Sequence, residues 1–486
     1  MQDTAPRLVV EAIDLHERDV ALRMPFRFGV VTLTHAPQAF VRVRVRLADG
    51  TTGEGMAAEL LAPKWFDKNP RFSNEDNFDQ LRAALGIARE LYLDGASDTA
   101  FGHFARHYAR QLERAAQRGL IPLVANYGPA LIDRAVLDAL CRALQLPFHE
   151  VIRANRAGIA PGGLCPDLAG FHWPVFLGGL QPSASIEARH TVGLVDPITR
   201  SDQTERVGDG LPETLEEVVS TYGHRWFKLK VAGDVAADLQ RLARIASVLD
   251  RIGGGYRASL DGNEQYDDID GIAELWRRMN AEPALTRLCA SVAFIEQPIK
   301  RQAALARDVR ALSSLKPVII DESDDSLDAF VRARELGYQG VSSKTCKGLY
   351  KSLINSARCA AWNDRARSAR GNAAAGEPIW FMSAEDLTIQ AGLALQQDLA
   401  LVSLMGIGHV ERNGHHYVNG MAALSASEQQ AFLDAHPDLY ERSHGAVRVR
   451  IRGGALSIGS LGGAGFASGA APDWASMRPM RTDRMP

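Results

Sequence analysis

Hydrophobic and polar residues alternate along the first 60 positions, which is the pattern of antiparallel strands with one buried face. Residues 39–47 (AFVRVRVRL) place apolar and basic side chains on opposite faces. Asp49-Gly50 then predicts a turn, after which residues 51–55 begin the returning antiparallel strand. Apolar residues at three- and four-residue spacing predict helices over 77–93, 100–116 and 128–144. Strands followed by helices predict an α+β domain over residues 1–150.

The pattern changes in the rest of the chain. Residues 151–186 are rich in Gly, Pro and Ala and predict an irregular connection. Over residues 187–425, short β-rich runs recur near 190, 226, 257, 292, 317, 339, 378 and 407, and most gaps hold a helical pattern. This alternation predicts an α/β fold with a TIM-type barrel. Residues 426–486 predict a further segment with a glycine-rich tail, whose last dozen residues we expect to be disordered.

Five apolar runs in this barrel region close on charged residues. The runs are WFKLK (226–230), SLDGN (259–263), FIEQP (294–298), VIIDES (318–323) and GVSSK (340–344). In a (β/α) barrel, the active site lies at the carboxyl ends of the strands. Lys228 and Lys230 are two residues apart, so they face the same side of a strand. We therefore expect these charged side chains to meet in one site.

The order of these residues predicts a specific chemistry. Asp261, Glu296 and Asp321 close three successive strands and would repel one another without a cation between them. Oxygen ligands of this kind favour Mg²⁺ over Zn²⁺. Lys344 closes the next strand and would approach from the opposite wall. A metal between two opposed lysines suits removal of the proton α to a carboxylate, with one lysine on each face.

Simpler interpretations exist for each residue alone. A lone KxK is usually a solvated edge, and carboxylates at strand ends also cap the following helix. Only the order K-x-K, D, E, D, K on consecutive strands favours catalysis. Asp321 and Glu322 are adjacent, so only one can point inward. We assign Asp321 to the metal and Glu322 to hydrogen bonds around the metal or a base.

Composition narrows the function classes. The net charge of −3 argues against a nucleic-acid or membrane-surface partner. No apolar run reaches the roughly 18–20 residues of a membrane span, and the start, MQDTAPRLVV, does not resemble a signal peptide. The five cysteines are scattered and contain no CxxC pair, which fits reduced thiols. These features predict a cytoplasmic protein.

The charged series resembles the enolase superfamily, in particular its muconate-cycloisomerase-like (mandelate racemase/muconate lactonizing enzyme) branch. The residues that carry the likeness are the KxK pair, the three carboxylates, KTCKG (344–348), the helical segment PALIDRAVLDALCRALQLPFHEVI (129–152) and GGALSIGSLGGAGF (453–466). The resemblance implies a (β/α)7β barrel under an N-terminal capping domain, with Mg²⁺ on Asp261, Glu296 and Asp321. It implies Lys230 as a base and Lys344 as the opposing base. Lys228 would hold the substrate carboxylate and lower the pKa of Lys230. It also implies a homo-oligomer.

The resemblance suggests further positions with open alternatives. Asn263 would face the site or serve a turn, and Glu411 would meet the distal substrate or form a structural salt bridge. Residues 24–34 match a mobile lid, and residues 62–68 lie where a second lid would close. Arg27 and Trp65 are the candidates for contacting the substrate side chain. His409, His415 and His416 resemble no catalytic dyad, and we expect surface or core roles for them.

The chain is about a hundred residues longer than is usual for the family, with additions near 62–120, 152–186 and 363–377. The sequence therefore predicts an enzyme that forms an enolate from a small-molecule carboxylate, as a racemase or epimerase, a dehydratase or a cycloisomerase. A non-catalytic barrel that binds a small molecule with its metal is the alternative. A metal-dependent aldolase would want histidine ligands, which these strand ends lack.

Overall fold

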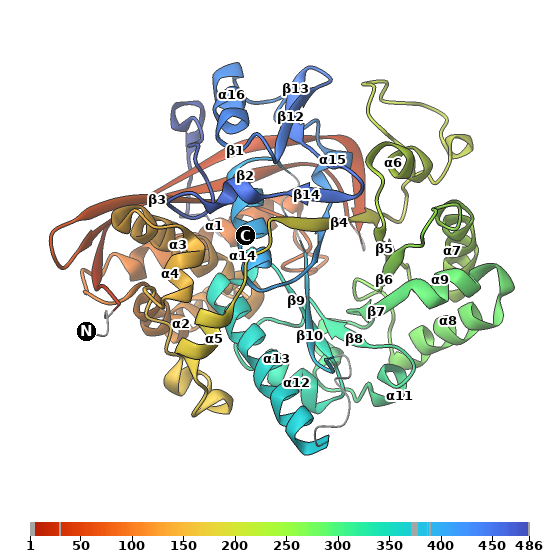
Figure 1. The fold of residues 1–486 in the computed structure, drawn as a ribbon, viewed down its shortest axis with the longest axis horizontal. Helices are drawn as coiled ribbons and strands as arrows, with labels where there is room; N and C mark the ends of the chain where they lie inside the picture. The colour runs from red at the N-terminus through yellow and green to blue at the C-terminus, as the bar shows by residue number, and fades with distance from the viewer. Residues whose placement is uncertain (1–4, 29–30, 371–377, 386, 388–389, 485–486) are drawn as a thin grey trace.

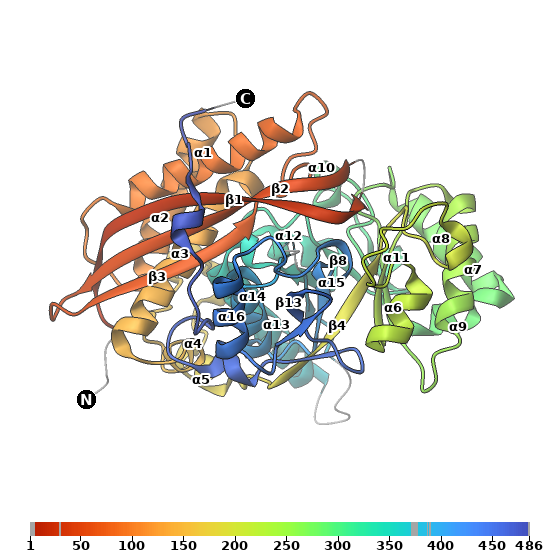
Figure 2. The same cartoon turned by 90° about the horizontal axis from the view of Figure 1, so that it is seen from above.

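The N-terminal part of the chain is an antiparallel sheet covered by three helices. The computed structural model describes residues 5–28, 31–370, 378–385, 387 and 390–484. Strands β1 (Leu8–Phe28), β2 (Val31–Leu47) and β3 (Thr52–Leu60) pair in order. Helix α3 (Pro122–Leu144) packs on this sheet, and α1 (Asn74–Tyr92) and α2 (Ala100–Gln117) pack on α3 (Figure 2). The predicted α+β pattern and its three helices are confirmed.

Two glycines of β3 explain how α3 packs so closely on the sheet. A Cβ at Gly53 would lie 2.2 Å from the Ala139 carbonyl oxygen, and one at Gly55 would lie 2.1 Å from that of Ala135. Only glycine leaves room for the helix backbone at these two positions. Helix α3 begins six residues before the predicted start, so Pro129, the second residue of the predicted helix, lies in its interior.

Histidine 107 of α2 gives this domain an expected sensitivity to acid. Its side chain is fully buried, and burial lowers its pKa to about 4 from an ordinary value of 6.5. Only the unfolded chain binds the proton between these values, so stability falls as the pH falls through this window. We expect His107→Gln to remove about 3 kcal/mol of the stability loss between pH 7 and 4. Urea unfolding at several pH values measures this. His172→Gln, at an exposed position, should keep the wild-type slope, and an unchanged slope for His107→Gln would contradict the assignment.

The larger part of the chain is a curled sheet of eight parallel strands. They are β4 (Ser185–Val192), β5 (Trp226–Lys230), β6 (Arg257–Asp261), β7 (Val292–Glu296), β8 (Val318–Ile320), β9 (Gly340–Ser343), β10 (Phe381–Ala384) and β11 (His409–Arg412). They pair in sequence order from β4 to β10, with β11 beside β4. The end strands β10 and β11 contact each other. All eight predicted strands are present.

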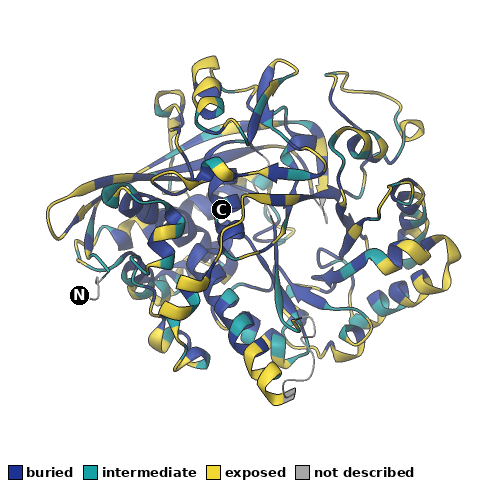
Figure 3. Ribbon diagram, in the orientation of Figure 1, coloured by how far each residue is buried: buried dark blue, intermediate teal, exposed yellow. Residues whose placement is uncertain are grey.

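Helices follow the strands and cover the outer face of this sheet (Figure 1). They are α6 (Leu215–Tyr222), α7 (Val235–Leu249), α8 (Ile269–Ala281), α9 (Thr286–Ser291), α10 (Arg301–Ala304), α11 (Arg310–Ser313), α12 (Ala329–Glu335), α13 (Leu349–Arg370) and α14 (Leu393–Leu404). Phe227 and Leu229 of β5 join Leu242 and Ile245 of α7 in one buried apolar cluster. The alternate residues Lys228 and Lys230 therefore point to the other face of the strand, as the sequence predicts. Figure 3 shows the same contrast between buried strands and exposed outer helix faces.

The remaining segments link the two parts. The predicted irregular connection begins within the short helix α4 (Phe148–Arg153) and contains α5 (Trp173–Gly179). After β11 come α15 (Gly414–Tyr417), α16 (Ala426–Ala435) and the hairpin of β12 (Tyr440–Ser443) and β13 (Ala446–Val449). Strand β14 (Ala455–Ser457) then pairs with β4. Among the described residues, no helix is both long and apolar enough to cross a membrane.

The C-terminal residues differ from the predicted disordered tail. Strand β15 (Arg478–Pro479) pairs with β1 at the edge of the first sheet. The Arg478 guanidinium donates to Asp19 at 2.7 Å and to Glu17 at 2.8 Å. Backbone pairing and these ion pairs hold β15 in place, although the glycine-rich sequence that precedes it predicts no structure. The segment therefore returns to the first domain, while the exact domain boundaries remain predictions.

Candidate active site

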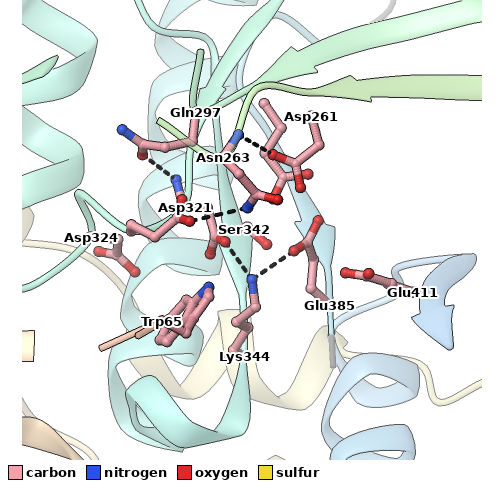
Figure 4. A network of polar contacts seen from close by, with 12 residues as sticks. Trp65, Asp261, Asn263, Gln297, Asp321, Asp324, Ser342, Lys344, Glu385 and Glu411 are labelled. Carbon is pink, nitrogen blue, oxygen red and sulfur yellow. Dashed lines mark hydrogen bonds and ion pairs between the residues drawn. The ribbon is translucent and has the colours of Figure 1, made fainter. Parts of the chain in front are cut away.

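The predicted side chains of Asp261, Asp321 and Lys344 lie together at the carboxyl ends of the strands (Figure 4). Lys228 is buried among the carboxylates of this site. Its Nζ is 2.7 Å from Asp261 Oδ2, 3.1 Å from Glu296 Oε2 and 3.0 Å from Glu411 Oε2. A fourth carboxylate, Glu385, has its Oε2 2.6 Å from the same nitrogen. One buried ammonium therefore joins carboxylates from four strand ends.

The two proposed bases lie on different walls of this site. Lys230 is on β5, and its Nζ is 2.5 Å from Asp261 Oδ2. Lys344 follows β9, so strands β6–β8 separate the two lysines along the sheet. Its Nζ contacts Asp321, lies 2.6 Å from Glu385 Oε2 and sits 4.8 Å from the centre of the Trp65 ring. The sheet thus presents one lysine on each side of the carboxylates.

Glu385 and Arg189 are the site residues that sequence reasoning missed. Glu385 directly follows β10 and is fully buried. Its Oε1 accepts a hydrogen bond from Arg189 Nη2 at 2.9 Å, and its Oε2 lies 2.6 Å from both Lys228 and Lys344. The sequence pattern that identified the other site residues is also present here, because Glu385 follows an apolar run (379–384, IWFMSA).

The carboxylates of the site fit a divalent cation held by oxygen ligands. Glu296, Asp321 and Glu385 each offer an oxygen, and these oxygens lie within 4.8 Å of one another. Among the described residues, Glu322 Oε2 and Asn263 Oδ1 are buried without a hydrogen-bond partner. Buried oxygens without donors are what a bound cation satisfies, and hard oxygen ligands suit Mg²⁺.

Mutual electrostatics set the charges in this cluster. Although burial opposes it, Lys228 and Lys230 lower the pKa of Asp261 to about 2. Burial together with Glu385 raises the pKa of Glu296 well above its usual range. Against the effect of burial, Asp321 and Glu385 raise the pKa of Lys344 well above its usual range. Lys344 is therefore a charged ammonium in this arrangement of side chains.

Asn263 and Glu322 form a second layer of hydrogen bonds beside the cluster. The Asn263 backbone N–H donates to Asp261 Oδ1 at 2.8 Å, and its side-chain amide donates to Glu322 Oε1 at 3.2 Å. Asn263 has a φ of 41°, so it also serves the turn after β6. Lys68 Nζ lies 3.4 Å from Glu322 Oε1. Both alternatives for Asn263 therefore hold, while Glu322 faces Lys68 and Asp321 faces Lys344.

Residues 62–68 pack over the site. The Trp65 side chain is 2% exposed. The Arg301 guanidinium donates to the carbonyl oxygens of Trp65 at 2.9 Å and Phe66 at 2.7 Å. Lys68 Nζ lies 2.5 Å from Glu264 Oε2. These contacts place the segment where a lid would close, and its mobility stays a prediction.

The predicted first lid is not a loop in the described residues. Strand β1 runs to Phe28 and β2 begins at Val31, with Phe26 opposite Leu33 and Arg27 opposite Thr32, while residues 29–30 lie outside the described part. Arg27 is exposed on this hairpin, whereas the carboxylates are buried. Strand pairing therefore extends to both sides of residues 29–30, and the predicted mobility of this segment stays a prediction.

Glu411 and the nearby histidines take structural positions. Glu411 on β11 accepts from Thr191 and from Asn413 Nδ2 at 3.0 Å, in addition to its contact with Lys228. This supports the salt-bridge alternative for Glu411. His409 stacks on Trp226 with ring centres 4.1 Å apart. His409, His415 and His416 are all largely buried, in agreement with core roles.

Comparison with known proteins defines the class of fold. Residues 210–363 match a family model described as enolase C-terminal domain-like. No curated protein sequence matches the chain. Similar solved structures include a mandelate racemase/muconate lactonizing protein from Herpetosiphon aurantiacus, with 20% identity over 94% of this chain and 98% of that chain and a TM-score of 0.55.

Two further structures share the fold. One is a muconate lactonizing enzyme from Pseudomonas fluorescens, complexed with muconolactone, with 18% identity over 96% of this chain and 97% of that chain and a TM-score of 0.56. The other is an L-Ala-D/L-Glu epimerase from Bacillus subtilis, with 16% identity over 95% of this chain and 99% of that chain and a TM-score of 0.55. Residues 210–363 thus match the enolase C-terminal domain, and the solved structures show that the whole chain shares the fold of these enzymes, in agreement with the resemblance seen in the sequence.

Proposed function

We propose that this protein is a Mg²⁺-dependent enzyme that removes the α-proton of a small-molecule carboxylate and forms an enolate. We also propose that the curled sheet is a TIM-type (β/α)7β barrel beneath an N-terminal capping domain. The observation that carries the proposal is the placement of Lys230 and Lys344 on different walls of one buried carboxylate cluster. A structural metal site needs no lysines on two walls.

The residues of the chain divide the work as follows. Lys230 takes the α-proton on one face of the substrate, and Lys344 takes or returns a proton on the other face. Lys228, with carboxylates on several sides, orients the substrate carboxylate. Trp65 covers Lys344 and excludes water from that side. A bound Mg²⁺ would supply electrostatic stabilisation for the charge that develops on the substrate carboxylate.

The choice of metal ligands rests on the charges around each carboxylate. We propose Asp261, Glu296 and Asp321. Glu385 already accepts from Arg189, and both side chains are fully buried. A carboxylate whose charge is already offset by an arginine gains less from a metal than one that is paired only with lysines. Glu385 therefore neutralises and positions the lysines in this account.

A set of four variants tests the ligand choice. We expect Asp261→Asn, Glu296→Gln and Asp321→Asn each to weaken Mg²⁺ binding by at least about 100-fold, since loss of supporting residues alone commonly causes 10–100-fold effects. We expect Glu385→Gln to weaken binding by less than about tenfold. Isothermal titration calorimetry with Mg²⁺ measures the affinity of all four variants and of the wild type. If Glu385→Gln loses Mg²⁺ and Asp261→Asn retains it, the ligand set is wrong.

The presence of Lys230 and Lys344 does not determine which product the enzyme forms from the enolate. The named neighbours include an epimerase and a muconate lactonizing enzyme. Racemisation or epimerisation, dehydration and cycloisomerisation all begin with the same enolate, so all three remain within the proposal. The proposed partner is a small carboxylate. The homo-oligomer and the cytoplasmic location stay predictions.

One observation favours the alternative of a non-catalytic, metal-dependent binding protein. Against the effect of burial, Asp261 and Glu296 raise the pKa of Lys228 well above its usual range, and Lys344 is likewise held charged. A charged ammonium cannot accept a proton. The enzyme requires that these carboxylates bind a cation instead, which would release the lysines from their ion pairs.

Solvent-deuterium exchange separates the two functions. The full chain is incubated in deuterated water with a panel of carboxylic acids, with Mg²⁺ or with a chelator, and deuterium at the α-carbon is measured by mass spectrometry. The proposal predicts Mg²⁺-dependent exchange into at least one acid. An acid that raises the Tm in the presence of Mg²⁺ without exchanging its α-proton would instead support the binding protein.

A further inference from the structure

Three buried histidines meet on the outer face of the sheet, away from the carboxylates. His190 is on β4, His224 lies two residues before β5, and His415 is in α15. The neighbours of His190 on β4, Arg189 and Thr191, bond to Glu385 and Glu411 in the active site. Because successive strand residues alternate, His190 points to the opposite face. The cluster is therefore separate from the proposed Mg²⁺ site.

The nitrogen atoms of the three rings converge. His190 Nδ1 is 3.1 Å from His415 Nε2, and His224 Nε2 is 3.2 Å from the same atom. All three ligand atoms lie within 4.8 Å of one another. Nitrogens bound to a tetrahedral zinc at about 2.0–2.1 Å are roughly 3.3 Å apart. Two of the observed separations are close to this value before any ion draws the rings together.

The protonation of the cluster suits metal binding. His224 Nδ1 lies 2.9 Å from the Ala188 carbonyl oxygen. A carbonyl only accepts, so His224 carries its proton on Nδ1 and turns the lone pair of Nε2 toward the other rings. Burial lowers the pKa of His224 to about 4 and those of His190 and His415 well below their usual range. Neutral imidazole is the form that binds metals.

The ligand type and the space beside His415 suit zinc. Imidazole ligands favour Zn²⁺ over Mg²⁺, whereas the carboxylates of the active site favour the reverse. A cavity of about 20 Å³ borders His415, Tyr222 and Gly414, so there is room for one water molecule beside this one ligand. A water at the fourth position can ionise near neutral pH when it is bound to zinc, and the resulting hydroxide would offset part of the buried charge.

We propose that His190, His224 and His415 bind one Zn²⁺ ion. The site ties β4, the start of β5 and α15 together behind the active site. It fixes His190 between the two residues that hold Glu385 and Glu411, and it fixes α15 directly after the end of β11. The ion is thus a structural brace for this wall of the sheet, and the proposal does not depend on the enolate chemistry.

Binding of Co²⁺ to the full wild-type chain tests the site. Co²⁺ is added after dialysis against a chelator, with Mg²⁺ in excess to occupy oxygen sites, and the visible spectrum is recorded. We expect one Co²⁺ per chain with the strong absorption bands of a tetrahedral nitrogen site, displaced by one equivalent of Zn²⁺. Weak octahedral bands alone, with no Zn²⁺ retained by the chain, would show that the histidines form only a hydrogen-bonded cluster and would overturn the proposal.

Matched variants locate the ion. His224→Gln and His415→Gln should each lose the tetrahedral bands and weaken Zn²⁺ binding by at least about 100-fold. His436→Gln, at a buried histidine elsewhere in the chain, should keep them. Zn²⁺ should raise the Tm of the wild type and of His436→Gln but not of the cluster variants. If the cluster variants do not fold, an anomalous zinc signal between the three rings in wild-type crystals supports the proposal, and no signal there contradicts it.

Discussion

Replacing Lys230 or Lys344 by alanine is expected to abolish net epimerisation while leaving half of the exchange reaction intact. Each lysine serves one face of the substrate, so each variant should still exchange the α-proton of one enantiomer with solvent. Loss of a positioned general base lowers a rate by about 10²–10⁴-fold, and exchange of the other enantiomer should fall by that amount. Deuterium incorporation, measured separately for the two enantiomers, gives both numbers.

The control for this experiment is an exposed lysine. Lys300 pairs with Asp267 at 2.5 Å on the surface, and Lys300→Ala should leave both exchange rates within about twofold of the wild type, because surface pairs contribute little. A dehydratase or cycloisomerase would show another pattern, in which only one lysine is needed for exchange. Equal loss of both enantiomers in each single variant would contradict the division of faces.

Removing the charge of Glu385 is expected to destabilise the fold more than loss of any surface carboxylate. Glu385 lies 2.6 Å from Lys228 and Lys344 and 2.9 Å from Arg189, and all four side chains are buried. Glu385→Gln would leave these three cations short of one negative partner. Breaking a buried ion pair from one side costs about 3–5 kcal/mol. Urea unfolding at pH 7 should show a loss of this size.

A surface pair provides the comparison for Glu385. Glu441 lies 3.5 Å from Arg452, and both side chains are exposed. Glu441→Gln should change the free energy of unfolding by less than about 1 kcal/mol. If Glu385→Gln is equally mild, then Glu296 and Asp321 balance the lysines without Glu385, and its role as the neutralising residue is lost.

The strands of the sheet could be predicted because their signal is local. Residues such as Phe227 and Leu229 alternate with Lys228 and Lys230 within five positions, and burial of one face fixes which side each takes. The ends of the long hairpin could not be predicted in this way. Phe26 pairs with Leu33 through backbone bonds that any side chain can make, so the sequence between them reads as a loop.

The site shows the same division between local and distant signals. Lys228, Asp261 and Glu296 were found because each closes its own apolar run, and the structure brings them together. Glu385 follows a similar run but belongs to no recognised motif. Arg189 lies in a strand with ordinary alternation, and only the closing of the sheet brings it to Glu385.

The histidine cluster depends on tertiary structure alone. His190, His224 and His415 come from β4, the segment before β5 and α15. His190 and His415 are 225 positions apart in the chain, and no spacing rule for metal ligands spans such a distance. The strand order, with β11 beside β4, is what makes them neighbours.

The most direct test of the central claim compares the wild type with a Lys230→Ala/Lys344→Ala double variant. Both are incubated in deuterated water with Mg²⁺ and an acid that the wild type exchanges, and α-deuterium is measured over time. The account predicts that the double variant loses exchange of both enantiomers by at least about 10²-fold, because both proton acceptors are gone. Exchange of both enantiomers at the wild-type rate would show that neither lysine moves the proton and would contradict the mechanism.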